Sequence, residues 1–179
     1  MDDVRQRDLA VYSKIYQLGF ENPALYQFFL FFSRYGILLF FLSFIYLIWV
    51  KRINALICSM FALGIAGLID LIIFIFWKRP RPFIAHANLV SAVADTSKVD
   101  IASFPSSHTY IAFAIATSIF LYGHKKLGAI LFLIAILVAV SRVGVGLHYP
   151  SDIIGGATLG IFSGIFACYI THKIERYWE

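Results

Sequence analysis

The stretch INALICSMFALGIAGLIDLIIFIFW, residues 53–77, decides the fold. Asp70 is its only charged residue. A helix rises about 1.5 Å per residue, so a helix over this stretch is longer than the hydrocarbon core of a bilayer, which is about 30 Å thick. The stretch therefore predicts a helix that crosses a membrane.

Further apolar runs lie on both sides of this stretch. They cover residues 24–50, 110–122, 127–140 and 153–170. The runs 110–122 and 127–140 are short, and flanking residues extend both. We expect an all-α membrane helix bundle with five or six membrane helices, forming a single domain over residues 1–179.

The first of these runs has a defined start and one interruption. Asn22 followed by Pro23 is typical of a helix start. Arg34 interrupts the apolar run, so the chain either breaks near residues 33–36 or continues as one long helix.

The overall composition supports a membrane protein. Hydrophobic residues make up 60% of the chain, the mean hydropathy is +0.81 and only 14% of residues are charged. The net charge of +5 comes from cations at the ends of apolar runs, which suits anionic headgroups better than nucleic acid. Cys58 and Cys168 lie inside apolar runs without metal-ligand spacing, so we interpret both as small hydrophobic residues.

The N-terminal residues 1–21 differ from the rest in being amphipathic. Apolar side chains recur on one helical face, at Leu9, Tyr12, Ile15, Tyr16 and Phe20. This spacing predicts a short helix that lies at the membrane interface.

Five spans place the long polar loop 78–105 and the turn 143–151 on the same side of the membrane. The loop carries Lys98 and several other cations, but three basic pairs lie on the opposite side. These pairs are Lys51 with Arg52, Lys125 with Lys126, and Lys173 with Arg176. The excess of basic residues there predicts that loop 78–105 is extracytoplasmic.

Polar residues that suit phosphate chemistry occur in three segments beside the apolar runs. The segments are Arg79-Pro80-Arg81-Pro82, Pro105-Ser106-Ser107-His108, and Ser141-Arg142 with His148 and Asp152. Arginine binds phosphate oxygens with two parallel hydrogen bonds, and free N–H groups at a helix start attract an anion. The predicted phosphate ligands are Arg81, Arg142, Ser106 and Ser107.

His148 and Asp152 are spaced four residues apart, so the carboxylate reaches one ring nitrogen of the histidine. We predict that Asp152 sets the tautomer and that the other nitrogen attacks phosphorus. His108 then donates a proton to the leaving oxygen and later activates water. No carboxylate cluster suits Mg²⁺, so we expect neither a metal nor another cofactor.

The three segments resemble the signature motifs of the type-2 phosphatidic acid phosphatase superfamily, which also contains the vanadium haloperoxidases. The motif S-R-x5-H-x3-D is complete from Ser141 to Asp152. The motif P-S-G-H reads Pro-Ser-Ser-His over residues 105–108.

The third motif, K-x6-R-P, is incomplete. Phe74 stands at the lysine position if Arg81 is the motif arginine, and Ile72 stands there if Arg79 is. The resemblance implies that Lys78 or Arg79 supplies the missing charge from another direction.

The resemblance covers about residues 70–155, and the run Arg81–His86 is similar to bacterial undecaprenyl-diphosphate phosphatases of the bacitracin-resistance type. It implies a multi-pass protein of the bacterial plasma membrane that hydrolyses undecaprenyl diphosphate through a phosphohistidine. Phosphatidylglycerophosphate and phosphatidate are alternative lipid substrates. Halide oxidation with vanadate and non-catalytic lipid binding are the other classes of function. The sequence sets no oligomeric state.

Several residues keep more than one interpretation. His86 either binds the lipid headgroup or shapes its loop, and Ser106 serves as a helix cap, a phosphate ligand or both. Asp70 orients an arginine, pairs with Arg34 or stays protonated. The four-residue spacing of Gly156, Gly160 and Gly164 predicts close packing inside the bundle in preference to dimerisation.

Overall fold

A computed structural model describes residues 2–86 and 102–178. Lys98 and most of the predicted loop 78–105 lie outside the described residues. The helices are α1 (Asp2–Glu21), α2 (Pro23–Trp49), α3 (Ile53–Phe76), α4 (Pro82–Ala85), α5 (Ser107–Leu121), α6 (Lys125–Gly144) and α7 (Pro150–Trp178). Within the described part, the predicted all-α fold is confirmed.

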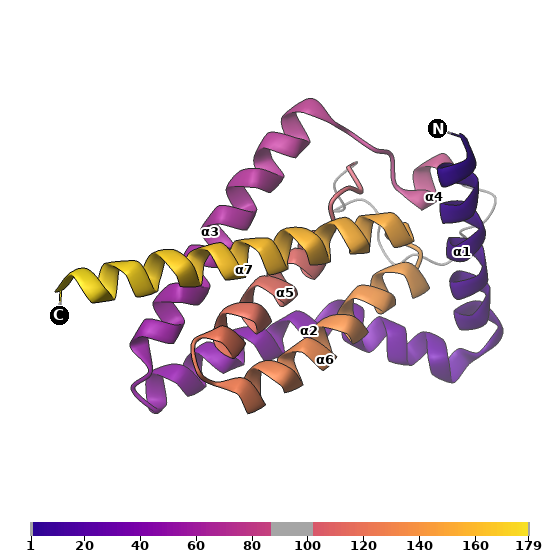
Figure 1. The fold of residues 1–179 in the computed structure, drawn as a ribbon. Coiled ribbons are helices and arrows are strands. Elements are labelled where there is room, and N and C mark those ends of the chain that lie inside the picture. Colours follow the sequence, from indigo (N-terminus) through magenta and orange to yellow (C-terminus); the bar gives the residue numbers. More distant parts are fainter. Residues whose placement is uncertain (1, 87–101, 179) are drawn as a thin grey trace.

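Four helices, α2, α3, α6 and α7, are long and apolar enough to cross a membrane. The apolar helix α5 has 15 residues and is therefore only about 22 Å long at about 1.5 Å per residue. The five helices run back and forth between two ends of the bundle (Figure 1). We call the end where α2, α5 and α7 begin the site end.

Helix α2 is continuous through Arg34, which removes the alternative of a break at residues 33–36. The side chain of Asn22 accepts hydrogen bonds from the N–H groups of Ala24 (3.1 Å) and Leu25 (3.2 Å), and Pro23 occupies the first turn. The predicted helix start is thus confirmed. The apolar run on both sides of Arg34 favours an unbroken helix, because a break in lipid would leave backbone groups without partners.

Helix α5 is the centre of the bundle and packs against α3, α6 and α7. The glycines of α7 allow its close approach. A Cβ atom at Gly160 would lie 2.5 Å from the carbonyl oxygen of Tyr110, and one at Gly156 would lie 2.8 Å from that of Ser106. The predicted packing of this glycine face inside the bundle is confirmed.

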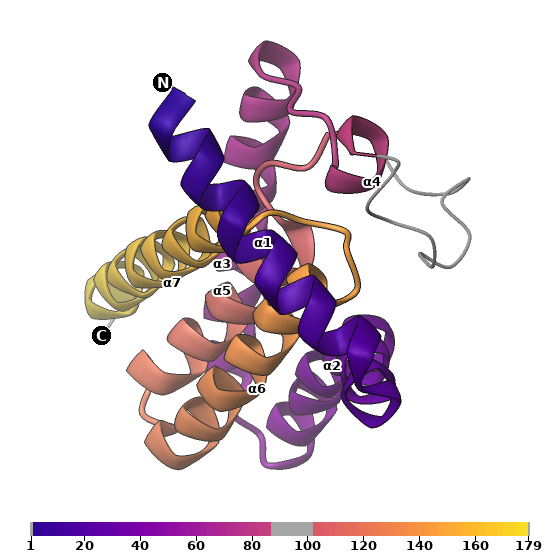
Figure 2. The ribbon, with the colours of Figure 1, turned by 90° about the vertical axis from the view of Figure 1, so that its right-hand side faces the viewer.

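Helix α1 lies across the site end, over the end of α6 and the start of α7 (Figure 2). Tyr12 and Tyr16 are buried against Val143 and Tyr149. The expected amphipathic helix is present, but much of its apolar face meets protein rather than lipid. The ring of Tyr12 packs against that of Tyr149, which follows His148 directly. Helix α1 is therefore joined to the segment that carries the candidate nucleophile.

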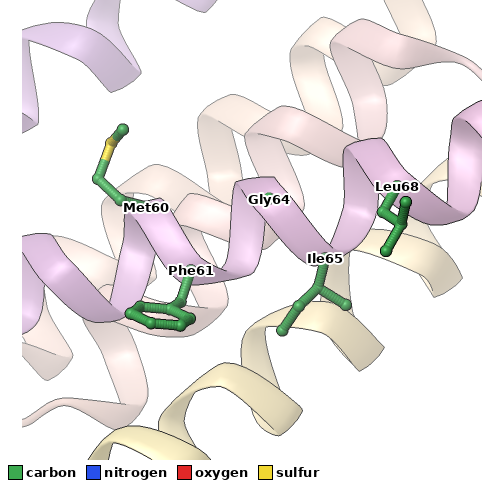
Figure 3. Close-up of a pocket in the computed structure, with 5 residues that line it drawn as sticks. All are labelled: Met60, Phe61, Gly64, Ile65 and Leu68. Carbon is green, nitrogen blue, oxygen red and sulfur yellow. The ribbon is translucent and has the colours of Figure 1, made fainter.

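A shallow apolar pocket of about 410 Å³ lies along the outer side of α3 (Figure 3). Its lining residues are Met60, Phe61, Gly64, Ile65 and Leu68. None of them is a predicted site residue, and Met60 and Leu68 are more than half exposed. We assign this pocket to the lipid-facing surface of the bundle.

Candidate active site

Two short segments that flank the undescribed residues 87–101 lie side by side at the site end. Pro80 and Ala102 form an isolated antiparallel bridge, and the N–H of Ser103 donates to the carbonyl of Arg79 at 2.8 Å. This pairing fixes the position of the Ser103 carbonyl group, which points at His148.

His148 lies in the connection between α6 and α7 and is 1% exposed. Gly146 allows the tight turn before it, since its φ of 83° is in the left-handed region. Nδ1 of His148 lies 2.8 Å from the Ser103 carbonyl oxygen, and Nε2 lies 2.9 Å from Nη1 of Arg81.

These two contacts define the tautomer of His148. A guanidinium group can only donate, so Nε2 accepts the hydrogen bond from Arg81. A carbonyl oxygen can only accept, so Nδ1 carries the proton and donates to Ser103. The lone pair of Nε2 consequently points toward Arg81, which is itself 7% exposed.

Asp152 supports His148 less directly than its spacing predicted. Its Oδ2 atom is 3.6 Å from Nδ1, which is beyond hydrogen-bond distance, and accepts instead from the N–H of Tyr149 at 2.8 Å. The position of Asp152 in the first turn of α7 turns its carboxylate toward that N–H group. The Ser103 carbonyl therefore sets the tautomer, while Asp152 contributes its negative charge.

The surroundings keep His148 neutral at pH 7. Burial lowers the pKa of His148 from its ordinary 6.5 to about 4. The positive charges of Arg142 and Arg81 contribute to this lowering of the pKa, and the nearby Asp152 opposes it. A neutral imidazole is the form that can act as a nucleophile.

Arg142 lies in the last turn of α6 and is 8% exposed. Its Nη1 donates to the Ser33 carbonyl at 3.1 Å and to the Ser33 hydroxyl at 2.7 Å. Its Nε–H is buried without a hydrogen-bond partner among the described residues. A buried charged donor without a partner is costly, and an anionic ligand would supply the missing acceptor.

Helix α5 begins at Ser107, so the first N–H groups of the helix have no partners within it. Ser106 occupies the cap position, but its side chain makes no capping bond and accepts from the Thr109 hydroxyl at 3.0 Å. His108 is half-buried and lies within electrostatic range of His148, Arg142 and Arg81. Of the predicted residues at the start of α5, His108 is thus the one that lies near the group formed by His148 and the two arginines.

The other predicted ligands lie apart from this group. The side chain of Arg79 points to Asp152 and not to the two other arginines, and its Nη1 donates to Asp152 at 2.8 Å. Lys78 is exposed and its ammonium group lies 5.0 Å from the ring centre of Phe74, one of the two residues at the family's lysine position. His86 is half-buried, and its ring stands edge-on to that of Tyr149 with 6.4 Å between ring centres.

Asp70 receives a hydrogen bond from the Tyr110 hydroxyl at 3.2 Å. The sequence-based alternatives for Asp70 are orientation of an arginine, pairing with Arg34 and protonation, and a tyrosine partner is not among them. The contact joins α3 to the first turn of α5.

Three residues of the site were missed from the sequence, namely Ser33, Ser103 and Asp8. Ser33 lies within an apolar run, where a lone serine is a weak signal. Ser103 acts through its backbone carbonyl, which any residue type provides. Asp8 is one of several charged residues near the N-terminus, and only the docking of α1 brings it to Arg79.

The comparisons with known proteins point to one family. The family model described as PAP2 superfamily matches residues 55–176. Undecaprenyl-diphosphatase BcrC of Bacillus subtilis is 40% identical over 104 residues, which cover 56% of this chain and 50% of that protein. Phosphatidylglycerophosphatase B of Bacillus subtilis is 35% identical over 85 residues, 42% of each chain. The chain thus spans about half the length, or less, of these curated relatives.

Solved structures share the fold. The crystal structure of Aquifex aeolicus LpxE has a TM-score of 0.73 and 29% identity, covering 89% of this chain and 93% of that one. The PAP2 type phosphatidylglycerolphosphate phosphatase of Bacillus subtilis also has a TM-score of 0.73, at 22% identity, covering 99% of this chain and 90% of the other.

Proposed function

The chain belongs to the PAP2 superfamily, and on this premise we propose that it is a membrane lipid phosphatase that hydrolyses undecaprenyl diphosphate. One observation carries the proposal. The lone pair of His148 Nε2 faces Arg81 at 2.9 Å, while Nδ1–H is held by the Ser103 carbonyl at 2.8 Å. A neutral, oriented nucleophile thus lies beside a group that binds phosphate bidentately.

In the first step, Nε2 of His148 attacks the terminal phosphorus. An N–P bond forms while the bond from phosphorus to the bridging oxygen breaks, and undecaprenyl phosphate leaves. His108 donates the proton that the leaving oxygen requires. The product on the enzyme is a phosphohistidine.

In the second step, His108 takes a proton from water, and the resulting oxygen attacks phosphorus. The N–P bond breaks, inorganic phosphate is released and Nε2 regains its lone pair. Arg81, Arg142 and the N–H groups at the start of α5 stabilise the negative charge on the phosphoryl oxygens in both steps. The buried Nε–H of Arg142 is a suitable donor for one of these oxygens.

The choice of lipid is supported by two relatives with similar names. Besides undecaprenyl-diphosphatase BcrC, the putative undecaprenyl-diphosphatase YbjG of Escherichia coli is 29% identical over 103 residues. Phosphatidylglycerophosphate is the second candidate, because phosphatidylglycerophosphatase B is 35% identical over a shorter stretch. In both cases the lipid tail stays in the bilayer while the phosphate reaches the site end.

We further propose that the site faces the extracytoplasmic side of a bacterial plasma membrane. At the end of the bundle opposite the site, Lys51 and Arg52 lie in the connection between α2 and α3, and Lys125 and Lys126 lie in the first turn of α6. Basic residues prefer the cytoplasmic side, which supports this orientation.

The test is phosphate release in detergent from undecaprenyl diphosphate, phosphatidylglycerophosphate and phosphatidate, each with and without a chelator. We expect the highest kcat/KM with undecaprenyl diphosphate, no effect of the chelator, and loss of turnover in His148→Ala. A control substitution, His124→Ala, changes a half-buried residue at the opposite end of the bundle and should leave turnover unchanged.

Each outcome has a distinct meaning. Preference for phosphatidylglycerophosphate would replace the substrate and keep the chemistry. Normal turnover in His148→Ala, or release from none of the three lipids, would reject the proposed phosphatase. Acid-labile, base-stable labelling of the wild type by substrate phosphate, absent from His148→Ala, would support the phosphohistidine.

A further inference from the structure

A carboxylate from the N-terminal helix reaches the polar network beneath His148. Asp8 of α1 lies outside the residues that match the family model, which begin at residue 55. Its side chain is 7% exposed. Oδ2 lies 2.6 Å from Nη2 of Arg79 and 2.6 Å from the hydroxyl of Ser151, and Oδ1 accepts from the Ser151 N–H at 2.9 Å.

Arg79 is held between two carboxylates by these contacts. While Nη2 donates to Asp8, Nη1 donates to Oδ1 of Asp152 at 2.8 Å and to the Ser151 hydroxyl at 2.6 Å. The ring of Tyr149 lies 4.0 Å from the guanidinium carbon and covers one face of the group. Arg79 therefore has a single defined orientation.

This orientation leaves the second oxygen of Asp152 available on the side of His148. Oδ1 of Asp152 binds Arg79, whereas Oδ2 binds the N–H of Tyr149 and lies 3.6 Å from Nδ1 of His148. A guanidinium with both arms available tends to bind both oxygens of one carboxylate. The pull of Asp8 on Nη2 prevents that arrangement here.

We propose that Asp8 is a positioning residue for the reaction at His148: it holds one arm of Arg79 so that only the other arm binds Asp152. The proposal rests on the function proposed above. Asp8 also accepts from the first turn of α7, which carries both Ser151 and Asp152. Helix α1 therefore both lies across the site end and holds residues next to His148 in position through Asp8.

A simpler role for Asp8 would be to anchor α1, and the two roles differ in what they predict. If Asp8 only anchors α1, its substitution lowers the stability of the protein, and any effect on turnover does not depend on Arg79. A positioning residue acts through Arg79 and lowers kcat with little change in KM, because neither Asp8 nor Arg79 belongs to the group that would bind the phosphate.

The experiment compares wild type with Asp8→Asn, using the lipid that the wild type hydrolyses fastest. The free energy of one hydrogen bond to a charged group corresponds to a factor of about ten or more in a rate constant. We therefore expect kcat to fall about tenfold while KM stays within about twofold. Asp8→Glu, which keeps the charge, should recover part of the loss. Glu21→Gln on the exposed end of the same helix is the matched control and should match wild type.

A double-mutant cycle identifies the route of the effect. In an Arg79→Gln background, Asp8→Asn should reduce kcat by less than about twofold, because the residue through which it acts is already gone. A full further loss in that background would show that Asp8 acts through helix docking and would overturn the proposal. Wild-type kcat in Asp8→Asn, or a change confined to KM, would overturn it as well.

A substitute variant and the wild-type activity cover the remaining outcomes of the test. If Asp8→Asn does not fold, as judged by its melting temperature in detergent, Arg79→Lys takes its place, since lysine lacks the two separate nitrogen arms that bind Asp8 and Asp152 in a fixed geometry. It should lower kcat at constant KM, and normal kcat in this variant would refute the inference. Absence of lipid hydrolysis by the wild type would instead refute the proposed function, so the two failures are distinguishable.

Discussion

Arg81 donates a hydrogen bond from Nη1 to Nε2 of His148 at 2.9 Å, so the guanidinium covers the lone pair that the proposed attack requires. The same guanidinium is the strongest candidate for binding the phosphoryl group. A phosphoryl group that binds Arg81 would draw it from Nε2 toward the phosphate oxygens. Substrate binding and exposure of the nucleophile are then a single event, which disfavours attack on Nε2 by other electrophiles.

The first prediction concerns the fork geometry of Arg81. Arg81→Lys keeps the positive charge but loses the planar group that contacts His148 and the Leu147 carbonyl together. Loss of a preorganised donor to a developing oxyanion costs about 100-fold or more in turnover, so we expect kcat/KM for lipid hydrolysis to fall by about that factor. Arg34→Lys, at an exposed position of α2, is the control. Equal small effects of both substitutions would contradict a specific role for Arg81.

The second prediction concerns the support of Arg142. Ser33→Ala removes the hydroxyl that accepts from Nη1 at 2.7 Å, although the Ser33 carbonyl remains. A hydrogen bond to a charged group contributes about 1.5–3 kcal/mol, so we expect kcat/KM to fall about tenfold. The control is Ser43→Ala on the same helix, where the buried hydroxyl donates only to the Phe40 carbonyl. Steady-state kinetics of the two variants check this, and a loss as large in Ser43→Ala would point to general destabilisation.

The third prediction concerns the acidic limb of the pH profile. The pKa of His148 is lowered to about 4, so the imidazole is neutral at pH 7 and protonates only as the pH falls through about 4. Protonation removes the lone pair, so activity limited by this group should be lost toward pH 4, well below the ordinary value of 6.5. The nearby Asp152 raises this pKa, so Asp152→Asn should move the limb to lower pH.

The measurement is kcat/KM against pH for wild type and Asp152→Asn with the same lipid. Titration of the substrate phosphate is common to both enzymes, so the difference between the two limbs belongs to the protein. A limb that stays in place, or moves to higher pH, would contradict the assignment of the limb to His148.

The fourth prediction concerns the packing of α7 on α5. Gly160→Ala places a methyl group 2.5 Å from the Tyr110 carbonyl oxygen, a backbone atom that cannot move aside. Overpacking of this kind costs about 1–3 kcal/mol, so the melting temperature in detergent should fall. Gly64→Ala is the matched control, because nothing lies within 4 Å of a Cβ atom at that position. Equal melting temperatures for the two variants would mean that α5 and α7 are less closely packed than described.

The amino-acid sequence by itself determined the helical membrane fold, the start of α2 at Pro23, the glycine face of α7 and the residues around which the site is built. These features follow from local properties. Hydropathy over one run of residues predicts a span, and a fixed spacing on a helix predicts which residues share a face. The alternation of spans then predicts that distant polar segments meet at one end.

Only the tertiary structure decided which groups hold the site residues in place. The partner of His148 Nδ1 is 45 residues away, that of Arg142 is 109 residues away, and Asp8 binds a residue 143 positions along the chain. Such contacts depend on the separation and rotation of packed helices, which no local pattern encodes. For that reason Ser103 rather than Asp152 sets the tautomer of His148, and a helix expected to lie at the membrane interface carries part of the site's support.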